Sequence, residues 1–557
     1  MSLLNPSTVL SACGEILLPI VLTFLFYILF HGARILYHEL TSPLRNLVGP
    51  GSPSLLTGNF TELIADFETT ENWRKMYGPT FQFRGLFSIS ELHTSDIKAI
   101  THVMTNSAIY GKAPFAMENS RQLMGDGIVS ANAHDHGRFR RILNPAFSAS
   151  QMRVLTETFV QKSIQLRDIW AEKIRQDSTG ETQIEAMTWL RLMTLEIIGK
   201  AGFNYDFNTL TGTEDSKPNE LDGVLKQIFM SPSSKWYETL RNARSLIPIL
   251  RFLPLPGSRL YVSARSKMQE IGSGILALSK AALNASETEE KPFDFAGKRD
   301  ILSVLLKANL SPDVPENQRL TDTELISQIP TFFIGGHETT SSAAAWALHA
   351  LSVHQDVQKK LRQELLTIST DNPTMDEINS LAYLERSNIV VRETLRVYSP
   401  IVFRHRTATK DDVLPLSKPC LDRDGRLHDS LLVPKGQTIF IPIHAINTDP
   451  ELWGPDAKEW KPSRWSSLPS TVTAIPTIWA NLLTFFAGPN NCIGFRFAVL
   501  ELKVVLFTVI RAFEVSPGVS EERVGRTVVP QRPVVRGEAG GKSVVALPLI
   551  LKAYEDI

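Results

Sequence analysis

The sequence predicts a mostly helical chain with small β-sheets, preceded by one apolar helix that can cross a membrane. Helical patterns cover most of the periodic segments, whereas strand-like alternation is confined to short runs such as 80–84. Residues 16–33 contain no Asp, Glu, Lys or Arg, and about 18 to 20 such residues can span a bilayer. The predicted helices are 69–77, 96–105, 151–177, 186–200, 321–351 and 374–397, and the predicted strands are 80–84, 401–406, 438–443 and 544–551.

The composition is that of a large globular protein. The chain has 557 residues with 58 basic and 58 acidic side chains, so its net charge gives no sign of nucleic-acid binding. Its three cysteines, Cys13, Cys420 and Cys492, share no spacing motif. This argues against a disulfide framework and for a reducing compartment. No repeat or Gly/Ser-rich linker divides the chain, so we expect one large domain behind the N-terminal helix.

The apolar segment 16–33 fits either a membrane anchor or a cleaved signal peptide. It has no basic region before it and no clear small-residue cleavage site, which favours the anchor. Glu15 precedes the segment and Arg34 follows it, so the positive-inside rule places the rest of the chain in the cytosol. The predicted organisation is an anchor at 1–37, a proline-rich hinge at 38–58 and a folded domain at 59–557.

A basic helical segment follows the first strands. His136 and Arg140 are four residues apart, so they share one helix face. Arg138 and Arg141 lie nearby, and a solvated basic face is therefore one explanation of the segment. The region 230–255 mixes aromatic, proline and apolar residues and shows no interpretable pattern.

The predicted helix 321–351 begins with a capping box formed by Thr321 and Glu324. At 1.5 Å per residue it is roughly 40 to 45 Å long and would cross the whole domain. Pro330 should kink the helix or move its start.

The middle of this helix has the sequence Gly-Gly-His-Glu-Thr, at 335–339. Glycine weakens a helix by about 1 kcal/mol relative to alanine, but Gly336 leaves room for a group to approach the backbone. Glu338 beside Thr339 is costly to bury in an apolar helix without a purpose. A packing site whose threonine bonds back to the helix is the alternative.

The predicted helix 374–397 contains Glu393 and Arg396, whose three-residue spacing puts a carboxylate beside a guanidinium. On these residues alone they could form a surface ion pair, worth under about 1 kcal/mol. Ser399-Pro400 ends the helix, and the next predicted strand ends at Arg406.

The segment 485–494 is a loop rich in Gly, Pro and Asn, with Cys492 near its end and an apolar helical run at 495–509 behind it. Backbone N–H groups of such a loop, together with the following helix N-terminus, favour the thiolate. A lone cysteine with phenylalanine and glycines at this spacing suggests an axial ligand to haem iron. A buried structural cysteine is the alternative.

This loop resembles that of the cytochrome P-450 family, the haem-thiolate monooxygenases, whose pattern is Phe-x-x-Gly-x-Arg-x-Cys-x-Gly. Phe485, Gly488, Cys492 and Gly494 match the pattern, and Asn490 stands where the family usually has arginine. The resemblance implies that these five residues surround haem b (iron protoporphyrin IX), with Cys492 as the iron ligand. It also implies a mostly α fold with small β-sheets.

The resemblance extends to basic residues upstream of the loop. The family usually has Trp-x-x-x-Arg where this chain has His136 and Arg140, and it implies that this pair reaches a haem propionate. Arg406 lies at the position of the family's second propionate arginine, with Arg404 as the nearby alternative.

Two further motifs match. The segment 335–339 is similar to the family's Ala/Gly-Gly-x-Asp/Glu-Thr motif, which implies that Thr339 delivers protons to bound dioxygen with Glu338 beside it. A later Pro-x-Arg-aromatic segment supplies Arg464. The resemblance implies that Arg464 closes a buried structural network with Glu393 and Arg396, which holds the loop before Cys492.

The function implied by the resemblance is insertion of one oxygen atom from O2 into a hydrophobic small molecule. Electrons would come from a membrane NADPH–cytochrome reductase, with cytochrome b5 as a second candidate donor. The protein would be a single-pass protein of the endoplasmic reticulum membrane, with its catalytic domain in the cytosol. The sequence is similar to fungal microsomal members, many of which oxidise terpenoids or other secondary metabolites.

Two other classes stay open at this point. One is a haem-thiolate isomerase or dehydratase that needs no dioxygen, against which the pair Glu338 and Thr339 argues. The other is a non-catalytic haem-binding sensor.

Overall fold

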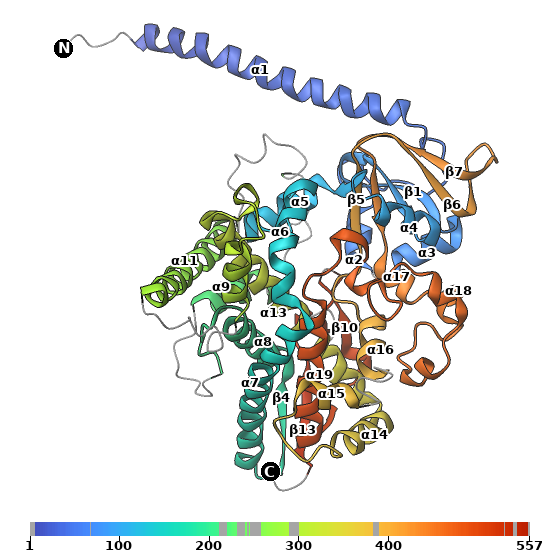
Figure 1. Cartoon of the computed structure of the whole chain (residues 1–557). Coiled ribbons are helices and arrows are strands. Elements are labelled where there is room, and N and C mark those ends of the chain that lie inside the picture. The colour runs from blue at the N-terminus through green and yellow to red at the C-terminus, as the bar shows by residue number, and fades with distance from the viewer. Residues whose placement is uncertain are drawn as a thin grey trace.

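The computed structural model describes residues 6–66, 68–210, 220–230, 240–241, 244, 258–288, 300–381, 389–528, 530–537 and 543–554. Figure 1 shows a helical body with a smaller strand-rich part at one side and one long helix, α1 (Pro6–Thr41), outside both. The predicted mostly α architecture with small sheets is therefore confirmed.

Helix α1 carries a segment, Val21–Thr41, that is long and apolar enough to cross a membrane, with mean hydropathy 1.3 and no part buried in the protein. The whole helix has 36 residues, which corresponds to about 54 Å. Its large apolar side chains are exposed, Phe26 at 70 % for example. Such a surface is costly in water, so the helix fits a transmembrane anchor. It continues past the expected boundary at residue 37 to Thr41.

The end of α1 is tied to the strand-rich part of the protein. The Glu39 carboxylate accepts hydrogen bonds from the Ser90 N–H at 2.8 Å and from the Arg84 guanidinium at 2.5 Å. Leu44 and Leu47, in the segment expected to be a hinge, are buried at 1 % and 3 % exposure. The part of the segment around these two leucines therefore packs against the domain.

The main sheet has five strands in the order β1-β2-β8-β5-β3, and β6 and β7 form a separate hairpin. An aromatic cluster of Trp73, Phe81, Phe83 and Phe440 fills one side of the sheet. The strands are β1 (Thr80–Arg84), β2 (Ser90–Thr94), β3 (Tyr110–Lys112), β5 (Arg404–Ala408), β6 (Asp412–Leu421), β7 (Leu427–Val433) and β8 (Thr438–Ile441).

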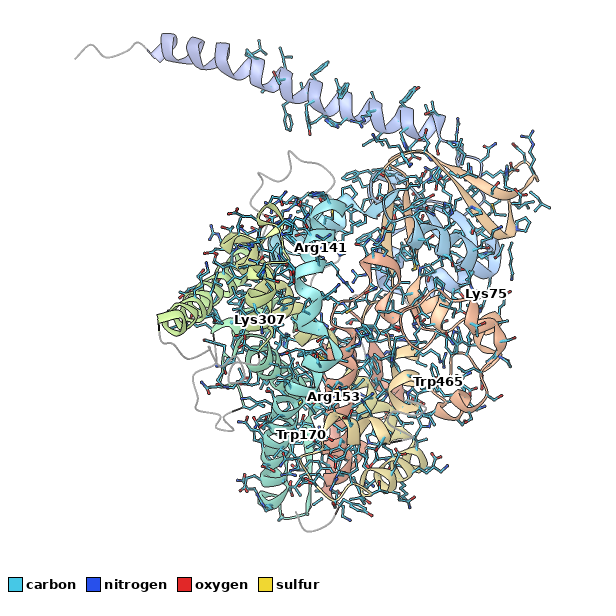
Figure 2. All side chains as sticks on the ribbon, viewed as in Figure 1. Lys75, Arg141, Arg153, Trp170, Lys307 and Trp465 are labelled. Atoms are coloured by element: carbon cyan, nitrogen blue, oxygen red, sulfur yellow. The ribbon has the colours of Figure 1, made fainter. Side chains whose placement is uncertain are left out.

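The helical body is built around α13 (Asp322–Val353), which packs against α8 (Ala186–Phe203) and α19 (Phe495–Ala512). Helix α7 (Ala149–Gln176) packs against α19, with the rings of Phe159 and Phe497 4.7 Å apart. Figure 2 shows how densely side chains fill this region, with Trp170 of α7 fully buried. The site described below lies where α13, α19 and the strand-rich part meet.

The remaining elements cover the body and its edges. They are α2 (Phe60–Ala65), α3 (Thr69–Tyr77), α4 (Ile97–Thr105), α5 (Pro114–Met124), α6 (Ala133–Leu143), α9 (Glu220–Met230), α11 (Ser258–Thr288), α12 (Ile301–Leu310), α14 (Gln355–Leu365), α15 (Met375–Ser380), α16 (Ile389–Val397), α17 (Ile443–Asn447), α18 (Pro450–Trp453), β4 (Glu181–Glu185), β9 (Phe513–Pro517), β10 (Val524–Arg526), β11 (Pro533–Val535), β12 (Val544–Val545) and β13 (Pro548–Ala553).

Most predicted elements lie within a few residues of observed ones, with two corrections. The predicted helix 374–397 is not continuous, because α15 ends at Ser380 and Leu381 is extended, with ψ 125°. The predicted strand 544–551 is divided into β12 and β13. Helix α13 begins at Asp322 with the predicted capping box, so Pro330 neither ends the helix nor moves its start. Most of the segment 230–255 lies outside the described residues.

Candidate active site

The loop before α19 folds back on itself around Cys492. The Cys492 N–H donates to the Phe485 carbonyl at 2.9 Å, while Phe485 itself is buried. Gly488 has φ +68°, and a Cβ atom there would lie 2.5 Å from the Met104 carbonyl oxygen. Only glycine satisfies both conditions. Gly494 is the N-cap of α19.

The Cys492 side chain lies among protein atoms but keeps accessible surface. Burial raises the pKa of the thiol, while the Gly494 N–H and the charges of Arg404 and Arg140 oppose this rise. The predicted donors are therefore present, and desolvation of the thiol opposes their effect on its pKa.

Five basic side chains surround this region. They are Lys112, His136, Arg140, Arg404 and Arg406, and within the described part of the chain none of them forms an ion pair with an acidic side chain. Burial and the nearby Arg406 and Arg404 lower the pKa of Lys112 to about 7. Burial and the neighbouring Arg404 lower the pKa of Arg406 to about 9. The positive charges of Lys112, Arg404 and Arg406 therefore repel one another without a compensating acidic side chain among the described residues.

Helix α6 divides its basic residues between two faces. The Arg140 guanidinium donates to the Asn491 carbonyl at 2.6 Å and to the Asn491 side-chain oxygen at 2.5 Å. Arg138 instead donates to Glu324 at 3.1 Å, and Arg141 donates to Gln318. The segment is therefore not a uniform solvated face. Of these three arginines, only Arg140 contacts Asn491, the residue before Cys492.

His136 occupies the same helix one turn earlier and is buried. Burial, followed by the charges of Lys112, Arg140 and Arg406, lowers its pKa to about 4. The imidazole is therefore neutral at physiological pH.

Strand β5 carries the two arginines that the sequence left as alternatives. Arg406 is buried, and its guanidinium lies 4.5 Å from the centroid of the Phe486 ring. Arg404 is exposed, and because it lies two residues before Arg406 on the strand, the two side chains share one face. Asn490, in the turn Gly488–Asn490, is half-buried.

Helix α13 is buried along most of its length, but it has one accessible strip. Gly335 is exposed and Thr339 is half-buried, whereas 328–334 and 340–352 are buried throughout. The Thr339 hydroxyl donates to the Gly335 carbonyl at 2.6 Å. A Cβ atom on Gly336 would lie 3.0 Å from Ile198 of α8, so this glycine permits close helix packing.

Glu338 is buried at 3 % exposure, and neither of its carboxylate oxygens has a hydrogen-bond partner among the described residues. Its Oε2 lies 3.9 Å from the Arg532 Nε atom. Burial raises the pKa of Glu338, while Arg532 and Arg191 act in the opposite direction.

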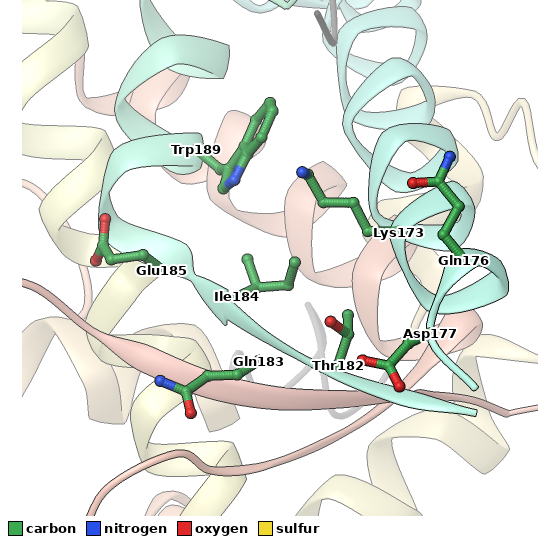
Figure 3. Close-up of a pocket in the computed structure, with 8 residues that line it drawn as sticks. All are labelled: Lys173, Gln176, Asp177, Thr182, Gln183, Ile184, Glu185 and Trp189. Carbon is green, nitrogen blue, oxygen red and sulfur yellow. The ribbon is translucent and has the colours of Figure 1, made fainter. Parts of the chain in front are cut away.

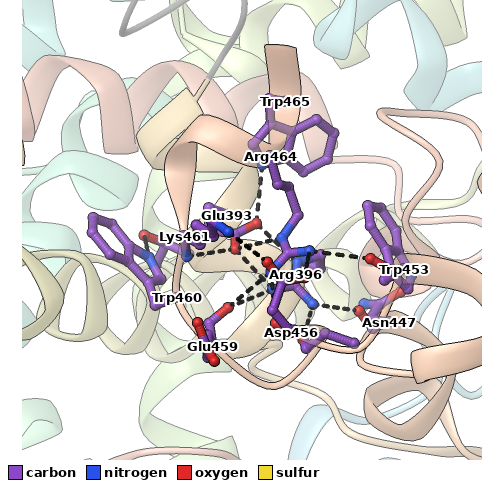
Figure 4. A network of polar contacts seen from close by, with 12 residues as sticks. Glu393, Arg396, Asn447, Trp453, Asp456, Glu459, Trp460, Lys461, Arg464 and Trp465 are labelled. Carbon is purple, nitrogen blue, oxygen red and sulfur yellow. Dashed lines mark hydrogen bonds and ion pairs between the residues drawn. The ribbon is translucent and has the colours of Figure 1, made fainter. Parts of the chain in front are cut away.

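The ion pair of α16 is part of a buried network (Figure 4). Arg396 donates twice to the Glu393 carboxylate, at 2.7 and 2.8 Å, and both side chains have 0 % exposure. Arg464 donates to Glu393 at 3.0 Å, and Trp465 does the same from its indole at 3.0 Å. The three residues named from the sequence therefore meet in the interior and form no surface ion pair.

This network is connected to the cysteine loop through Asn447. Arg396 donates to the Asn447 carbonyl at 3.0 Å. The Asn447 side chain in turn accepts from the Leu483 N–H and donates to the Thr484 hydroxyl, both at 2.9 Å. Leu483 and Thr484 directly precede Phe485, so the network fixes the entry to the loop.

A model of the cytochrome P-450 family matches residues 48–534 of this chain. The chain belongs to the cytochrome P-450 family. Its relatives include cytochrome P-450 monooxygenase 128 of Postia placenta, 44 % identical over 539 residues that cover 96 % of this chain and 97 % of the relative. Monooxygenase 205 of the same fungus is 42 % identical, covering 93 % and 94 %. A ganoderic acid synthetase of Ganoderma lucidum is 34 % identical, covering 88 % and 90 %.

The protein is thus a cytochrome P-450 monooxygenase, and its family carries haem iron. The residues present fit that group. Among the described residues, the accessible Cys492 thiol lies near three arginines, Arg140, Arg404 and Arg406, that form no ion pair with an acidic side chain. An anionic group placed among these charges would relieve their mutual repulsion. The two carboxylates of a haem supply such charge.

Sequence reasoning missed several residues of this cytochrome P-450 site. Lys112 ends a three-residue strand, and no pattern singles it out. Asn491 and Asn447 act through hydrogen bonds to loop backbone, so their roles depend on partners far away in the chain. Arg532 lies in no motif, and its position near Glu338 depends on the fold.

A separate cavity of about 320 Å³ lies at the end of α7, strand β4 and the start of α8 (Figure 3). Its lining residues include Lys173, Asp177 and Glu185. No residue assigned to the site from the sequence lines it, so this cavity does not belong to the site.

Proposed function

We propose that the protein is a membrane-anchored haem-thiolate monooxygenase that inserts one oxygen atom from O2 into a hydrophobic small molecule. The observation that carries this proposal is the cluster of five basic side chains near the accessible Cys492 thiol, none of which forms an ion pair with an acidic side chain in the described part of the chain. Haem b, held through Cys492, is the proposed form of the cofactor. When bound, thiolate-ligated haem iron supplies the activation of dioxygen.

The protein's own residues have distinct proposed tasks. Arg140 and Arg406 neutralise the propionates, with His136 and Lys112 as further contacts and Arg404 as the alternative to Arg406. Phe485, Gly488 and Gly494 shape the loop, and Asn490 lies in its turn without the charge that arginine would bring. Arg140 also holds the Asn491 carbonyl, so it fixes the loop while it serves the cofactor.

Proton supply is assigned to Thr339 and Glu338. The Thr339 hydroxyl lies on the accessible strip of α13, where Gly335 has no side chain to cover it. Glu338 is buried beside it, and burial raises its pKa and so favours the protonated carboxyl; this carboxyl is the proposed proton donor. The hydrogen bond from Thr339 to Gly335 leaves the threonine oxygen able to accept.

The Glu393, Arg396 and Arg464 network has a structural role in this proposal. It holds residues 483–484 through Asn447 and thereby positions the loop that ends at Cys492. No member of the network is assigned a chemical step.

Helix α1 is the proposed anchor, in the endoplasmic reticulum membrane with the catalytic domain in the cytosol. Monooxygenases of this family generally use redox partner reductases and hydrophobic substrates. We infer an NADPH–cytochrome reductase as the donor, with cytochrome b5 as a second one. The boundary between anchor and domain is placed after Thr41, where α1 ends.

The proposed substrate class is a terpenoid or another hydrophobic secondary metabolite. Support comes from the fungal relatives, one of which is named for ganoderic acid synthesis. The test is reconstitution with a fungal reductase, NADPH and isotopically labelled O2, using a panel of such compounds. A product that carries one labelled oxygen atom is expected. A product without label would instead indicate an isomerase or a dehydratase.

A further inference from the structure

A cluster of buried titratable groups lies on the side of α13 away from its accessible strip. At 100° per residue, His337 lies opposite Gly335 and Thr339 on the helix. His337 has 0 % exposure, and neither of its ring nitrogens has a hydrogen-bond partner among the described residues. Burying such groups unpaired is costly, and ordered water commonly satisfies them in proteins.

Three other elements bring charges to this cluster. Arg191 of α8 forms a buried ion pair with Asp222 of α9. Arg532, which lies between β10 and β11, reaches to within 3.9 Å of Glu338. Both arginine charges act on His337, and Asp222 acts on Glu338 as well. Asp222, at 8 % exposure, extends the cluster from α13 to α9.

The distance between His337 and Glu338 and the directions of their pKa shifts suit proton transfer between them. The His337 Nδ1 atom lies 3.5 Å from the Glu338 Oε1 atom, slightly beyond a direct hydrogen bond and within reach of a small adjustment. Burial and the two arginines lower the pKa of His337, while burial raises the pKa of Glu338. Burial therefore favours the neutral imidazole and the protonated carboxyl, which is the direction that a proton transfer from His337 to Glu338 requires.

We propose that His337 relays protons from the α8–α9 side of the protein to Glu338 and so replenishes the acid that serves Thr339. This inference rests on the proposed role of Glu338. A hydronium ion that reaches the cluster from bulk solvent protonates the imidazole at Nε2 and leaves water, and the resulting imidazolium gives its Nδ1 proton to the Glu338 carboxylate. The ring returns to its neutral form, and one proton has moved inward with no change in oxidation state.

Infrared spectroscopy of the resting protein tests the relay without turnover. The band of the protonated Glu338 carboxyl is the one that disappears in Glu338→Gln. After transfer into D2O, the half-time of its shift measures how fast protons reach this carboxyl. His337→Gln should slow the exchange about tenfold or more, because an amide does not relay protons as an imidazole does.

His349→Gln is the matched control, since His349 is also a buried histidine of α13 and lies twelve residues from His337, about 18 Å along the helix. It should leave the exchange rate unchanged. If His337→Gln retains less haem than the wild type, His337→Leu is measured in the same way. Exchange as fast in the His337 variants as in the wild type would overturn the relay, as would the absence of a protonated Glu338 band.

Activity measurements distinguish a failure of the proposed relay from a failure of the proposed role of Glu338. With reductase and a substrate, both Glu338→Gln and His337→Gln should lower the ratio of product to NADPH consumed, and His337→Gln should also increase the solvent isotope effect. If Glu338→Gln leaves this ratio unchanged, the role of Glu338 itself is overturned. If only Glu338→Gln lowers the ratio, the relay alone is overturned.

Discussion

The Arg140 guanidinium and the Asn491 carbonyl are joined by a hydrogen bond of 2.6 Å. This contact ties helix α6 to the residue before Cys492, across 351 positions of the sequence. A second bond, from the same guanidinium to the Asn491 side-chain oxygen at 2.5 Å, makes the contact bidentate. Planar, two-pronged recognition of this kind is specific to arginine.

Arg140→Leu should therefore weaken haem retention, because it removes both a positive charge and the clamp on the loop. Hydrogen bonds from a charged group contribute about 1.5 to 3 kcal/mol, so haem binding should weaken by about tenfold or more. The measurement is the ratio of haem to protein after purification and after competition with apomyoglobin. Arg141→Leu, on the same helix but bonded to Gln318, should retain haem as the wild type does. Equal retention in the two variants would contradict the assignment.

Glu393→Gln should destabilise the protein strongly. It leaves Arg396 and Arg464 buried without their shared carboxylate, and breaking a buried ion pair in this way costs about 3 to 5 kcal/mol. Thermal unfolding followed by circular dichroism measures the loss. Glu172→Gln removes the carboxylate of an exposed pair with Arg175 and should change the unfolding midpoint little. A similar small change in Glu393→Gln would show that the network does not support the fold.

His93 gives the strand-rich part a sensitivity to acid. It is stacked on Phe81 with a centroid distance of 4.2 Å, and burial lowers its pKa to about 3. The unfolded chain takes up a proton on this histidine near pH 6.5, whereas the folded protein does not. The contribution of His93 to the free energy of unfolding is therefore fully present above pH 6.5 and decreases as the pH is lowered further. By pH 5 the loss amounts to about 2 kcal/mol.

His93→Phe should remove this contribution. Between pH 7 and pH 5 the unfolding midpoint of the variant should fall less steeply than that of the wild type. Parallel pH profiles for the two proteins would mean that His93 is protonated in the folded state.

Thr339→Ala should keep haem, fold and substrate binding, because alanine suits a helix better than threonine. If the hydroxyl organises protons, product formation should fall by about 10²- to 10⁴-fold, while NADPH consumption continues and its electrons appear as hydrogen peroxide. The measurement is product formed per NADPH consumed, alongside peroxide. Unchanged coupling would exclude Thr339 and make Thr340 the next residue to examine.

The sequence predicted the parts of this protein that depend on local patterns. The capping box at Thr321 and Glu324 defines the start of α13 because both partners lie within one helical turn. The spacing of Glu393 and Arg396 likewise places them together. These features need only nearby residues, so they can be recognised before the fold is known.

The rest depends on contacts between distant segments. Nothing in the sequence shows that Lys112, on a three-residue strand, joins the arginines of β5, since their pairing arises from the sheet. The desolvation that raises the pKa of the Cys492 thiol is hidden for a related reason, because loop donors can be recognised in the sequence but the packing around the sulfur cannot. The break after Ser380 was hidden by residues that favour helix on both sides.

The measurement that tests the central claim most directly is the absorption spectrum of the reduced protein with carbon monoxide, recorded for the wild type and for Cys492→Ser. The wild type should show the Soret band of thiolate-ligated haem, and the variant should lack this band, because serine offers no thiolate to the iron. A Cys492→Ser protein that kept the thiolate band would contradict the assignment of Cys492 as the haem ligand.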